Sequence, residues 1–475
     1  MINYTVKLGV VPTRRFIFSK KDAIKFKDLT YERLNELNVD YVDIEDINEE
    51  GLFYSEEHLD AISEKMRKNN VDALFFPHCN FGTEDIVGKL AKKMGLPVCI
   101  WGPRDDAPLP DGSRLRDSQC GLFATGKVLR RFKVPFTYIP NGTLQDASFE
   151  RGIKNFIAAA NVVKVFKNLR ILQISTRPSD FWTMMYNEGE LLEKFGIQIS
   201  PVPLSDVVRK AKKLIEKPDG KVKETIEYIR ENMEVCVDEE GLLKVAALKT
   251  AMRYFIDKNK CQAAAIQCWD ALQADLGLMP CTGNAILTDE GIPVACETDI
   301  HGAITSVIAQ AAAMGETATF FADWTVRHPS NDNGELLQHC GPYPISLCKA
   351  GTKAKLGSPF ALPGGKPGAV LSEIKGGDMT ILRFDGDGGK YSLLAGAAKG
   401  IEGPYIWGTY VWIEVKDWLK LEKKLVEGPY VHHCVGIHKD ILPAVSEALK
   451  YIEGLDADFY DDDAQAKVDE YLLGR

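Results

Sequence analysis

Short apolar runs alternate with segments of helical spacing along the first third of the chain. The runs VKLGVVP, YVDIED, VDALFFP and PVCIWGP have the length and β-branched content of buried strands. Between them, residues 20–38, 55–69 and 84–94 carry apolar side chains three and four positions apart, as amphipathic helices do. Strands that alternate with helices in this way predict a doubly wound parallel sheet, which we place in residues 1–168.

The same alternation begins again after residue 168 and then gives way to a different pattern. NLRILQIS, GIQISPV, CQAAAIQC and PVACE predict the strands of a second α/β domain, residues 169–325. Beyond that point short strands are separated by glycine turns, as in AVLSEIKGGDMTILRFDGDGGKYSLLAGAAKG. This pattern predicts a mainly antiparallel, barrel-like β domain with closing helices, residues 326–475.

Two acidic residues, Glu297 and Asp323, each stand at the end of an apolar run. An Ala/Ile/Val-rich helical segment separates the two runs, so the sequence reads as strand, helix, strand. Such a crossover places both strand ends at one edge of a parallel sheet, where α/β folds display functional groups. We therefore expect the two carboxylates to lie close together and carry the chemistry. The alternative is that each acid only caps the helix that follows it.

Composition excludes several classes of protein. The chain has 475 residues, is 45% hydrophobic and 26% charged, and carries a formal net charge of -9, so it shows no basic footprint for nucleic acid or an anionic membrane. No apolar run approaches the ~18 residues of a membrane span, and the first residues lack a leader pattern. Eleven cysteines without a CxxC pair read as free thiols. We expect a cytoplasmic protein.

Three motifs resemble the L-fucose isomerase family: GIPVACETDIHGAIT, FFADW and YVHHCVGIH. The resemblance implies an aldose-ketose isomerase that works on a divalent metal, usually Mn²⁺ with Mg²⁺ as an alternative, held by Glu297, Asp323 and His433. Two carboxylates and an imidazole suit such a hard cation. The resemblance also implies self-association, with a trimer-based hexamer in which the first domain of one protomer covers the active site of the next.

The predicted chemistry is proton transfer through an enediol or enediolate. A carboxylate of Glu297 or Asp323 removes the proton at C2 of the sugar, and a second acid/base group handles O1 and O2 or returns the proton to C1. Candidate contacts to the substrate are Arg14, Trp101, Gln267, Trp269 and His339. Asp299 and His301 could supply a metal ligand or polarise one, or else cap the following helix and pack there, and His432 and His438 compete with His433 for its role.

The substrate and the reaction class stay open at this point. The family's usual substrate is a neutral deoxyhexose or pentose such as L-fucose or D-arabinose. Six arginines offer enough positive charge to bind an anionic hexose such as sulfoquinovose, and they are equally consistent with ordinary ion pairs. A metal-dependent sugar lyase or epimerase on the same scaffold, or a non-catalytic sugar-binding protein, are the alternatives. The arginines are Arg14, Arg15, Arg104, Arg114, Arg116 and Arg177.

Overall fold

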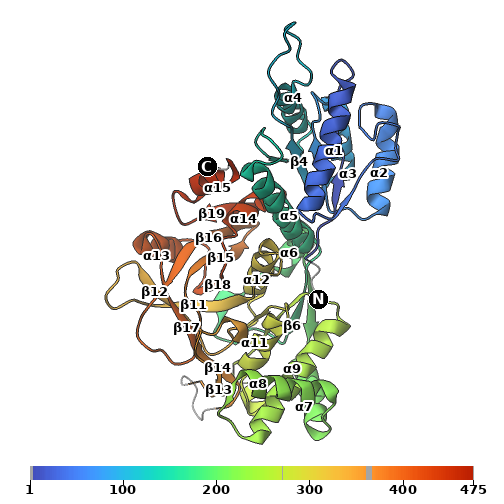
Figure 1. Ribbon diagram of the computed structural model, residues 1–475. Helices are drawn as coiled ribbons and strands as arrows, with labels where there is room; N and C mark the ends of the chain where they lie inside the picture. Colours follow the sequence, from blue (N-terminus) through green and yellow to red (C-terminus); the bar gives the residue numbers. More distant parts are fainter. Residues whose placement is uncertain (1–3, 270, 360–365, 474–475) are drawn as a thin grey trace. The chain divides into compact units, whose positions relative to one another are not determined.

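A computed structural model describes residues 4–269, 271–359 and 366–473 and divides the chain into two compact units (Figure 1). The first unit comprises Tyr4–Lys164, Pro443–Glu453 and the C-terminal segment from Gln465. The second unit comprises Val165–Leu442 and Gly454–Ala464. The second unit therefore contains both a second parallel sheet and the β barrel.

The first unit is built on a five-stranded sheet of order β2-β1-β3-β4-β5 in which all neighbours are parallel. The central strands are wholly buried because helices flank the sheet, which explains their continuous apolar runs. This is the predicted doubly wound fold. Its elements are β1 (Leu8–Val10), α1 (Lys20–Glu36), β2 (Tyr41–Val42), η1 (Glu56–His58), α2 (Leu59–Lys68), β3 (Ala73–Pro77), α3 (Glu84–Met94), β4 (Val98–Trp101), α4 (Ser118–Arg131), β5 (Thr137–Tyr138), α5 (Ala147–Lys167), α14 (Leu442–Leu449) and α15 (Ala464–Leu473).

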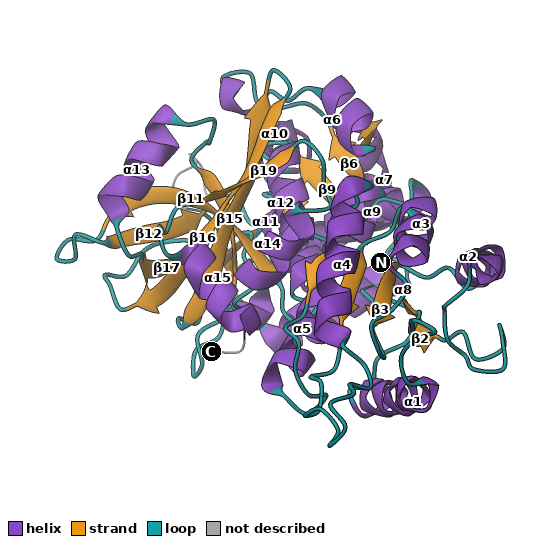
Figure 2. Ribbon diagram, turned by 90° about the horizontal axis from the view of Figure 1, so that it is seen from above, coloured by secondary structure: helices purple, strands orange, loops and turns teal. Residues whose placement is uncertain are grey.

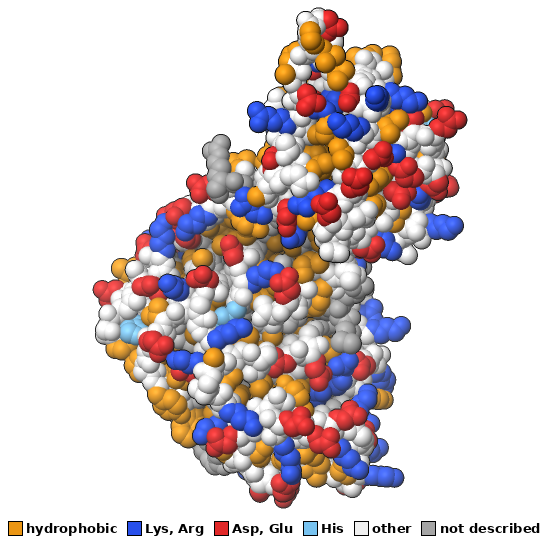
Figure 3. Space-filling view, viewed as in Figure 1, with side chains coloured by type: hydrophobic (Ala, Val, Ile, Leu, Met, Phe, Trp, Pro, Cys, Tyr) orange, Lys and Arg blue, Asp and Glu red, His pale blue; other side chains and the backbone are white. Residues whose placement is uncertain are grey.

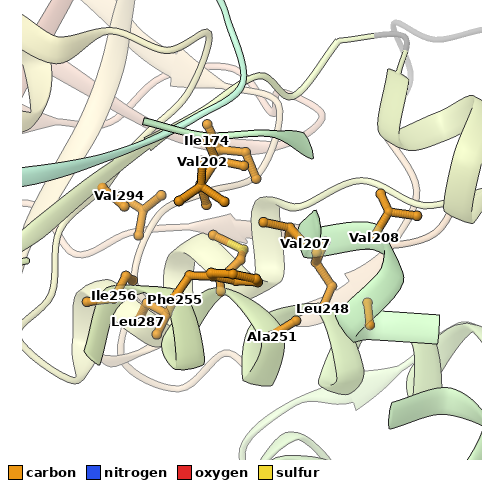
Figure 4. Close-up of a cluster of buried hydrophobic side chains, with 14 of the residues drawn as sticks. Ile174, Val202, Val207, Val208, Leu248, Ala251, Phe255, Ile256, Leu287 and Val294 are labelled. Atoms are coloured by element: carbon orange, nitrogen blue, oxygen red, sulfur yellow. The ribbon is translucent and has the colours of Figure 1, made fainter. Parts of the chain in front are cut away.

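The second parallel sheet has four strands in the order β10-β9-β6-β7. Helices α7 and α9 pack together, and their apolar faces meet side chains of α11 and of the sheet in the buried cluster of Figure 4. The elements are β6 (Arg170–Ile174), η2 (Trp182–Met184), α6 (Glu188–Phe195), β7 (Gln198–Val202), α7 (Leu204–Glu216), α8 (Gly220–Asn232), α9 (Glu239–Lys258), β9 (Ala263–Ile266), α10 (Ala271–Leu276), α11 (Cys281–Asp289), β10 (Val294–Ala295) and α12 (Ile300–Ala312).

The barrel is a closed ring of six antiparallel strands in the order β16-β15-β18-β11-β12-β17, which the β16–β17 pair completes. The strands are visible at the left of Figure 2, with α13 outside them. Four further strands extend the sheet at its edges. The elements are β8 (Glu234–Val235), β11 (Thr319–Arg327), β12 (Gly334–His339), η3 (Ile345–Leu347), β13 (Lys355–Gly357), β14 (Ala369–Glu373), β15 (Asp378–Asp387), β16 (Lys390–Ile401), β17 (Thr409–Glu414), α13 (Trp418–Glu427), β18 (His433–Ile437) and β19 (Leu455–Phe459).

One prediction about the strands is wrong. We expected the strands of Glu297 and Asp323 to be parallel neighbours at one sheet edge. The strand of Asp323, β11, instead belongs to the barrel, where it pairs antiparallel with β12 and β18. β10, the strand before Glu297, lies in the other sheet beside β9. The two carboxylates must therefore meet across two sheets.

The surface carries charges of both signs. Lys and Arg side chains are interspersed with Asp and Glu over the face in Figure 3, in keeping with the mixed composition of the chain. Among the described residues, no helix combines the length and the apolar character needed to cross a membrane.

Candidate active site

Glu297 lies between β10 and α12 in an unusual backbone conformation. Its φ is 51° and that of Thr298 is 57°, in the left-handed region that residues with a side chain rarely occupy. Both residues are buried. The next residue, Asp299, caps α12 by accepting a hydrogen bond from the backbone N–H of Gly302 at 2.9 Å. A strained conformation held by a buried turn points to a functional constraint on Glu297.

Asp323 and His433 are neighbours across the barrel wall. They are directly paired in the register of β11 and β18, so their side chains stand on the same face of the sheet. Helix α12 packs against β11, β15 and β18 on that face, as Figure 1 shows. The turn that begins α12 therefore brings Glu297 to the pair of barrel residues.

A fourth residue, His339 at the end of β12, completes what we call the four-residue cluster: Glu297, Asp323, His339 and His433. His433 Nε2 lies 3.3 Å from Asp323 Oδ1 and 3.7 Å from Glu297 Oε2. His339 Nε2 lies 3.4 Å from Glu297 Oε2 and 4.0 Å from Asp323 Oδ1. Predicted metal ligands and a predicted substrate contact thus converge on one point.

Electrostatic interactions within the cluster shift the pKa values of Glu297 and His339 in opposite directions. Burial alone would raise the pKa of Glu297, but the adjacent His339 and His433 lower it to about 2. Burial would likewise lower the pKa of His339, but Asp323 and Glu297 raise it well above its usual value. Glu297 and His339 therefore favour each other's charged forms when no ion lies between them.

The donor atoms fit a divalent metal ion. Glu297 Oε2, Asp323 Oδ1 and His339 Nε2 are buried and make no hydrogen bond to any described residue. The nitrogen and oxygen atoms of Glu297, His339 and His433 come close enough to one another to share an ion, and so do those of Asp323, His432 and His433. Oxygen-rich ligands 3 to 4 Å apart suit a hard cation bound at roughly 2.1–2.6 Å.

The two imidazoles of the cluster differ in the hydrogen-bond partner of Nδ1, the ring nitrogen that does not face the carboxylates of the cluster. His433 Nδ1 lies 2.9 Å from Asp299 Oδ2, so its N–H points at that carboxylate and Nε2 keeps a lone pair for the cluster. His339 Nδ1 instead accepts a hydrogen bond from the backbone N–H of Cys340 at 2.9 Å. A neutral His339 then carries its proton on Nε2 and faces the carboxylates as a donor.

A buried ionic network holds Asp299 behind His433. Arg383 on β15 bonds to both oxygens of Asp299, at 3.2 Å for the Nη2–Oδ1 pair, and its Nε donates to Asp385 at 2.8 Å. Asp385 in turn lies 2.9 Å from His301 Nδ1. Burial would raise the pKa of Asp299, but Arg383 and His433 lower it. This network, which sequence reasoning missed, fixes α12 to the barrel strands.

The other oxygen of Glu297 is also held. Trp269 Nε1 donates to Glu297 Oε1 at 2.9 Å, and the thiol of Cys268 lies 3.1 Å from the same oxygen. Gln267 accepts a hydrogen bond from the Ser175 hydroxyl at 2.6 Å. The end of β9 therefore orients Glu297 so that Oε2 faces the cluster. Cys268 is a buried free thiol, as expected for the cysteines of this chain, but its contact with Glu297 does not follow from the sequence.

Two predicted substrate contacts, Arg14 and Trp101, lie in the first unit, where neighbouring side chains already engage them. Arg14 is 8% exposed, donates to Glu50 at 2.8 Å and lies over the ring of Tyr54. Trp101 is 0% exposed and packs against Phe149, with 4.7 Å between ring centroids. The structure leaves no exposed indole face at Trp101 on which a sugar ring can stack.

Most of the arginines considered for an anionic substrate are paired with carboxylates. Arg15 contacts Glu84 at 2.7 Å. Arg114 contacts Asp117 at 2.7 Å, and Arg116 contacts Asp106 at 3.0 Å. Of the competing histidines, His438 lies 2.7 Å from the carbonyl of Lys375, away from the cluster. Arg177 differs from Arg15, Arg114 and Arg116 because it donates to backbone carbonyls of its own loop rather than to a carboxylate.

Comparisons with known proteins agree with the motifs. Residues 9–167 match the N-terminal domain of fucose/sulfoquinovose isomerases. A sulfoquinovose isomerase from Alkalicoccus urumqiensis is 27% identical over 400 residues, which cover 83% of this chain and 88% of that protein. A sulfoquinovose isomerase from Priestia aryabhattai is 27% identical over 77% of this chain and 80% of its own.

One more relative and one solved structure complete the comparison. A sulfoquinovose isomerase from Clostridium sp. (strain MSTE9) is 24% identical over 82% of this chain and 86% of its own. A periplasmic solute binding protein from Actinobacillus succinogenes 130z with bound D-allose covers 65% of this chain and 92% of its own at 13% identity, with a TM-score of 0.18 that supports no argument. The motifs around Glu297, Asp323 and His433 and these relatives, which match over most of the chain, together support the L-fucose isomerase-like family of fucose/sulfoquinovose isomerases.

Proposed function

We propose that the chain is a divalent-metal-dependent isomerase that interconverts an anionic aldose, sulfoquinovose, and the corresponding ketose through an enediol. The observation that carries the proposal is the four-residue cluster, in which Glu297 Oε2, Asp323 Oδ1 and His339 Nε2 are buried without a hydrogen bond to a described residue and lie close to His433 Nε2. The anionic substrate is inferred from the relatives, which are named sulfoquinovose isomerases.

We assign the metal to Glu297, Asp323 and His433, with Mn²⁺ or Mg²⁺ as the ion. Their donor atoms are two oxygens and a nitrogen whose lone pair is freed by the hydrogen bond from His433 Nδ1 to Asp299. When bound, the ion supplies positive charge that stabilises the enediolate developing from the substrate.

The chain's own groups move the protons. One carboxylate of the Glu297 and Asp323 pair takes the C2 proton, and the second acid/base group returns a proton to C1 or serves the two oxygens. The pair is coupled through shared neighbours, so we assign the two duties jointly. His339, as an Nε2–H donor, is suited to bond a substrate oxygen beside Glu297.

Surrounding residues set the geometry of the proton transfer. Trp269 and Cys268 occupy Oε1 of Glu297, so Oε2 is the oxygen that meets the substrate. Gln267 and Trp269 follow the C-terminal end of β9, are half-buried, and are suited to contact sugar hydroxyl groups.

The test is metal-stripped protein incubated with sulfoquinovose, L-fucose and D-arabinose in D₂O, with and without Mn²⁺, followed by NMR. We expect ketose from sulfoquinovose only with metal, with deuterium entering at C1 or C2. Glu297→Gln is expected to lower the rate by about 10²- to 10⁴-fold, the usual contribution of a general base. The variant Glu224→Gln, at an exposed position on α8, serves as the matched control. Tight metal binding without any ketose would favour a lyase or epimerase.

A further inference from the structure

The loop that follows β6, residues 175–187, borders the four-residue cluster. The hydroxyl of Thr298, the residue after Glu297, donates to the carbonyl of Thr176 at 2.9 Å. The ring of Phe181 lies 6.4 Å from that of Trp269, whose N–H bonds to Glu297. These contacts tie the loop to the turn that presents the catalytic carboxylate.

Arg177 stands in this loop directly after Thr176. Its side chain is half-buried, and its Nη1 donates to the carbonyls of Pro178 and Ser179 at 3.1 and 3.0 Å. No carboxylate among the described residues pairs with it. Asp180, in the same loop, accepts a hydrogen bond from Ser179 instead.

Several other arginines of the second unit are paired with carboxylates, while Arg170 donates to the side chain of Gln198 and the carbonyl of Asn259. Arg209 pairs with Asp206 at 3.1 Å, Arg253 pairs with Asp257 at 2.9 Å, and Arg383 pairs with Asp299 and Asp385. A guanidinium left without a counter-ion and fixed by its own loop carbonyls has a defined plane and further N–H groups to offer. Such a group is prepared to bind an oxyanion in two-pronged fashion.

We propose that Arg177 binds the terminal sulfonate of the substrate and thereby selects an anionic sugar over a neutral one. The inference rests on the proposed function, because it needs the carbonyl end of an aldose at Glu297 and Asp323. The remaining carbons of a six-carbon chain then extend from the cluster toward the loop that carries Arg177, which Thr176 and Phe181 hold beside Thr298 and Trp269. A neutral sugar carries only a hydroxyl at that end and gains little from the charge.

The test compares Arg177→Gln and Arg177→Lys with the wild type, using sulfoquinovose and D-glucose, which differ only in the group at C6. Arg177→Gln is expected to lower kcat/KM for sulfoquinovose roughly 10- to 100-fold, the value of a charge-assisted hydrogen bond, mostly through KM. Turnover of D-glucose and Mn²⁺ affinity should change less than about twofold. Arg177→Lys keeps the charge without the planar fork and should lie between the two.

Two further measurements separate recognition from general damage. Methanesulfonate should compete with sulfoquinovose in the wild type and compete more weakly in Arg177→Gln. Arg209→Gln, which removes an exposed arginine on α7, is the matched control and should behave as the wild type.

The outcomes distinguish the two proposals. Wild-type protein that isomerises neither sugar contradicts the proposed function. Wild-type protein that isomerises sulfoquinovose while Arg177→Gln keeps the same preference and the same inhibition overturns the assignment of Arg177 alone. An equal loss for both sugars, or a fall in Mn²⁺ affinity, also overturns it, because the residue would then support the loop rather than the sulfonate.

Discussion

The side chain of His433 is positioned by the carboxylate of Asp299, which is in turn held by Arg383. Its N–H points at Asp299, which caps α12 and is bound by Arg383. A carboxylate behind an imidazole fixes the ring orientation and strengthens the imidazole as a metal ligand. One acidic residue therefore couples the start of α12 to the strand that carries His433. Of the roles considered for Asp299 from the sequence, the helix cap is confirmed, and the role of polarising a metal ligand stays a prediction that its contact with His433 supports.

Replacing Asp299 tests that coupling. Asp299→Asn keeps an acceptor for His433 but removes the charge, so we expect the Mn²⁺ dissociation constant to rise about 10- to 100-fold, measured by calorimetry on metal-stripped protein. Asp385→Asn perturbs the same network one link further from His433 and should have a smaller effect. Equal affinities for the wild type and Asp299→Asn would show that His433 needs no partner.

Glu335 on β12 gives a pH-dependent contribution to stability. It is 2% exposed, and burial, with Glu422 nearby, raises its pKa to about 7 from 4.5. Between pH 4.5 and 7 the unfolded chain ionises this group while the folded chain keeps it protonated, so stability falls as pH rises across that window and is level above it.

The size of that effect follows from the shift. About 2.5 pH units at 1.36 kcal/mol each predicts a loss of about 3 kcal/mol between pH 4.5 and 7. We expect urea denaturation of Glu335→Gln to lack this part of the pH dependence, so the difference from the wild type should change with pH by that amount. Parallel pH profiles for the two proteins would contradict the raised pKa.

Local patterns along the chain predict where the helices and strands lie. They do not predict which strands pair with one another or which distant residues their side chains contact. The run ending in FFAD predicted a strand correctly, but alternation along one strand does not say which sheet it joins. The hairpin read from FDGDGG is confirmed: β15 and β16 are joined at Gly388 and Gly389, both at positive φ. The role of Arg383 in that hairpin was missed because its partner Asp299 is 84 residues away.

The contact between α12 and the barrel depends on Gly302. A Cβ added there would meet the ring of Phe321 at 2.4 Å and Asp299 Oδ2 at 2.7 Å. Helix propensity alone favours Ala over Gly by about 1 kcal/mol, but overpacking costs typically 1–3 kcal/mol. We expect Gly302→Ala to lower the free energy of unfolding and to weaken Mn²⁺ binding, because it separates Glu297 from Asp323 and His433.

Gly220 supplies the control for that substitution. It is the first residue of α8, and a Cβ there would meet nothing within 4 Å. Gly220→Ala should be neutral or slightly stabilising in thermal unfolding and leave Mn²⁺ affinity unchanged. If Gly302→Ala were also stabilising, the close approach of α12 to β11 would not be what assembles the cluster.

At the scale of the whole molecule, the four-residue cluster is complete within one compact unit. All four members lie in the second unit, and so does the network through Asp299 and Arg383. The family resemblance, in contrast, implies that the first domain of a neighbouring protomer covers the active site. Metal binding and catalysis should therefore respond differently to dissociation of the assembly.

Dilution separates the two properties. We expect a trimer-based hexamer in sedimentation velocity, and activity per chain that falls as dilution dissociates it, because a lone chain lacks the neighbour's cover over the substrate. Mn²⁺ affinity should stay constant over the same range, since the groups assigned to the metal belong to one unit. Adding back catalytically inactive Glu297→Gln protein to dilute wild type should restore activity, because that variant still supplies an intact first domain. Activity per chain that is independent of concentration down to the monomer would mean that each chain builds its whole site alone.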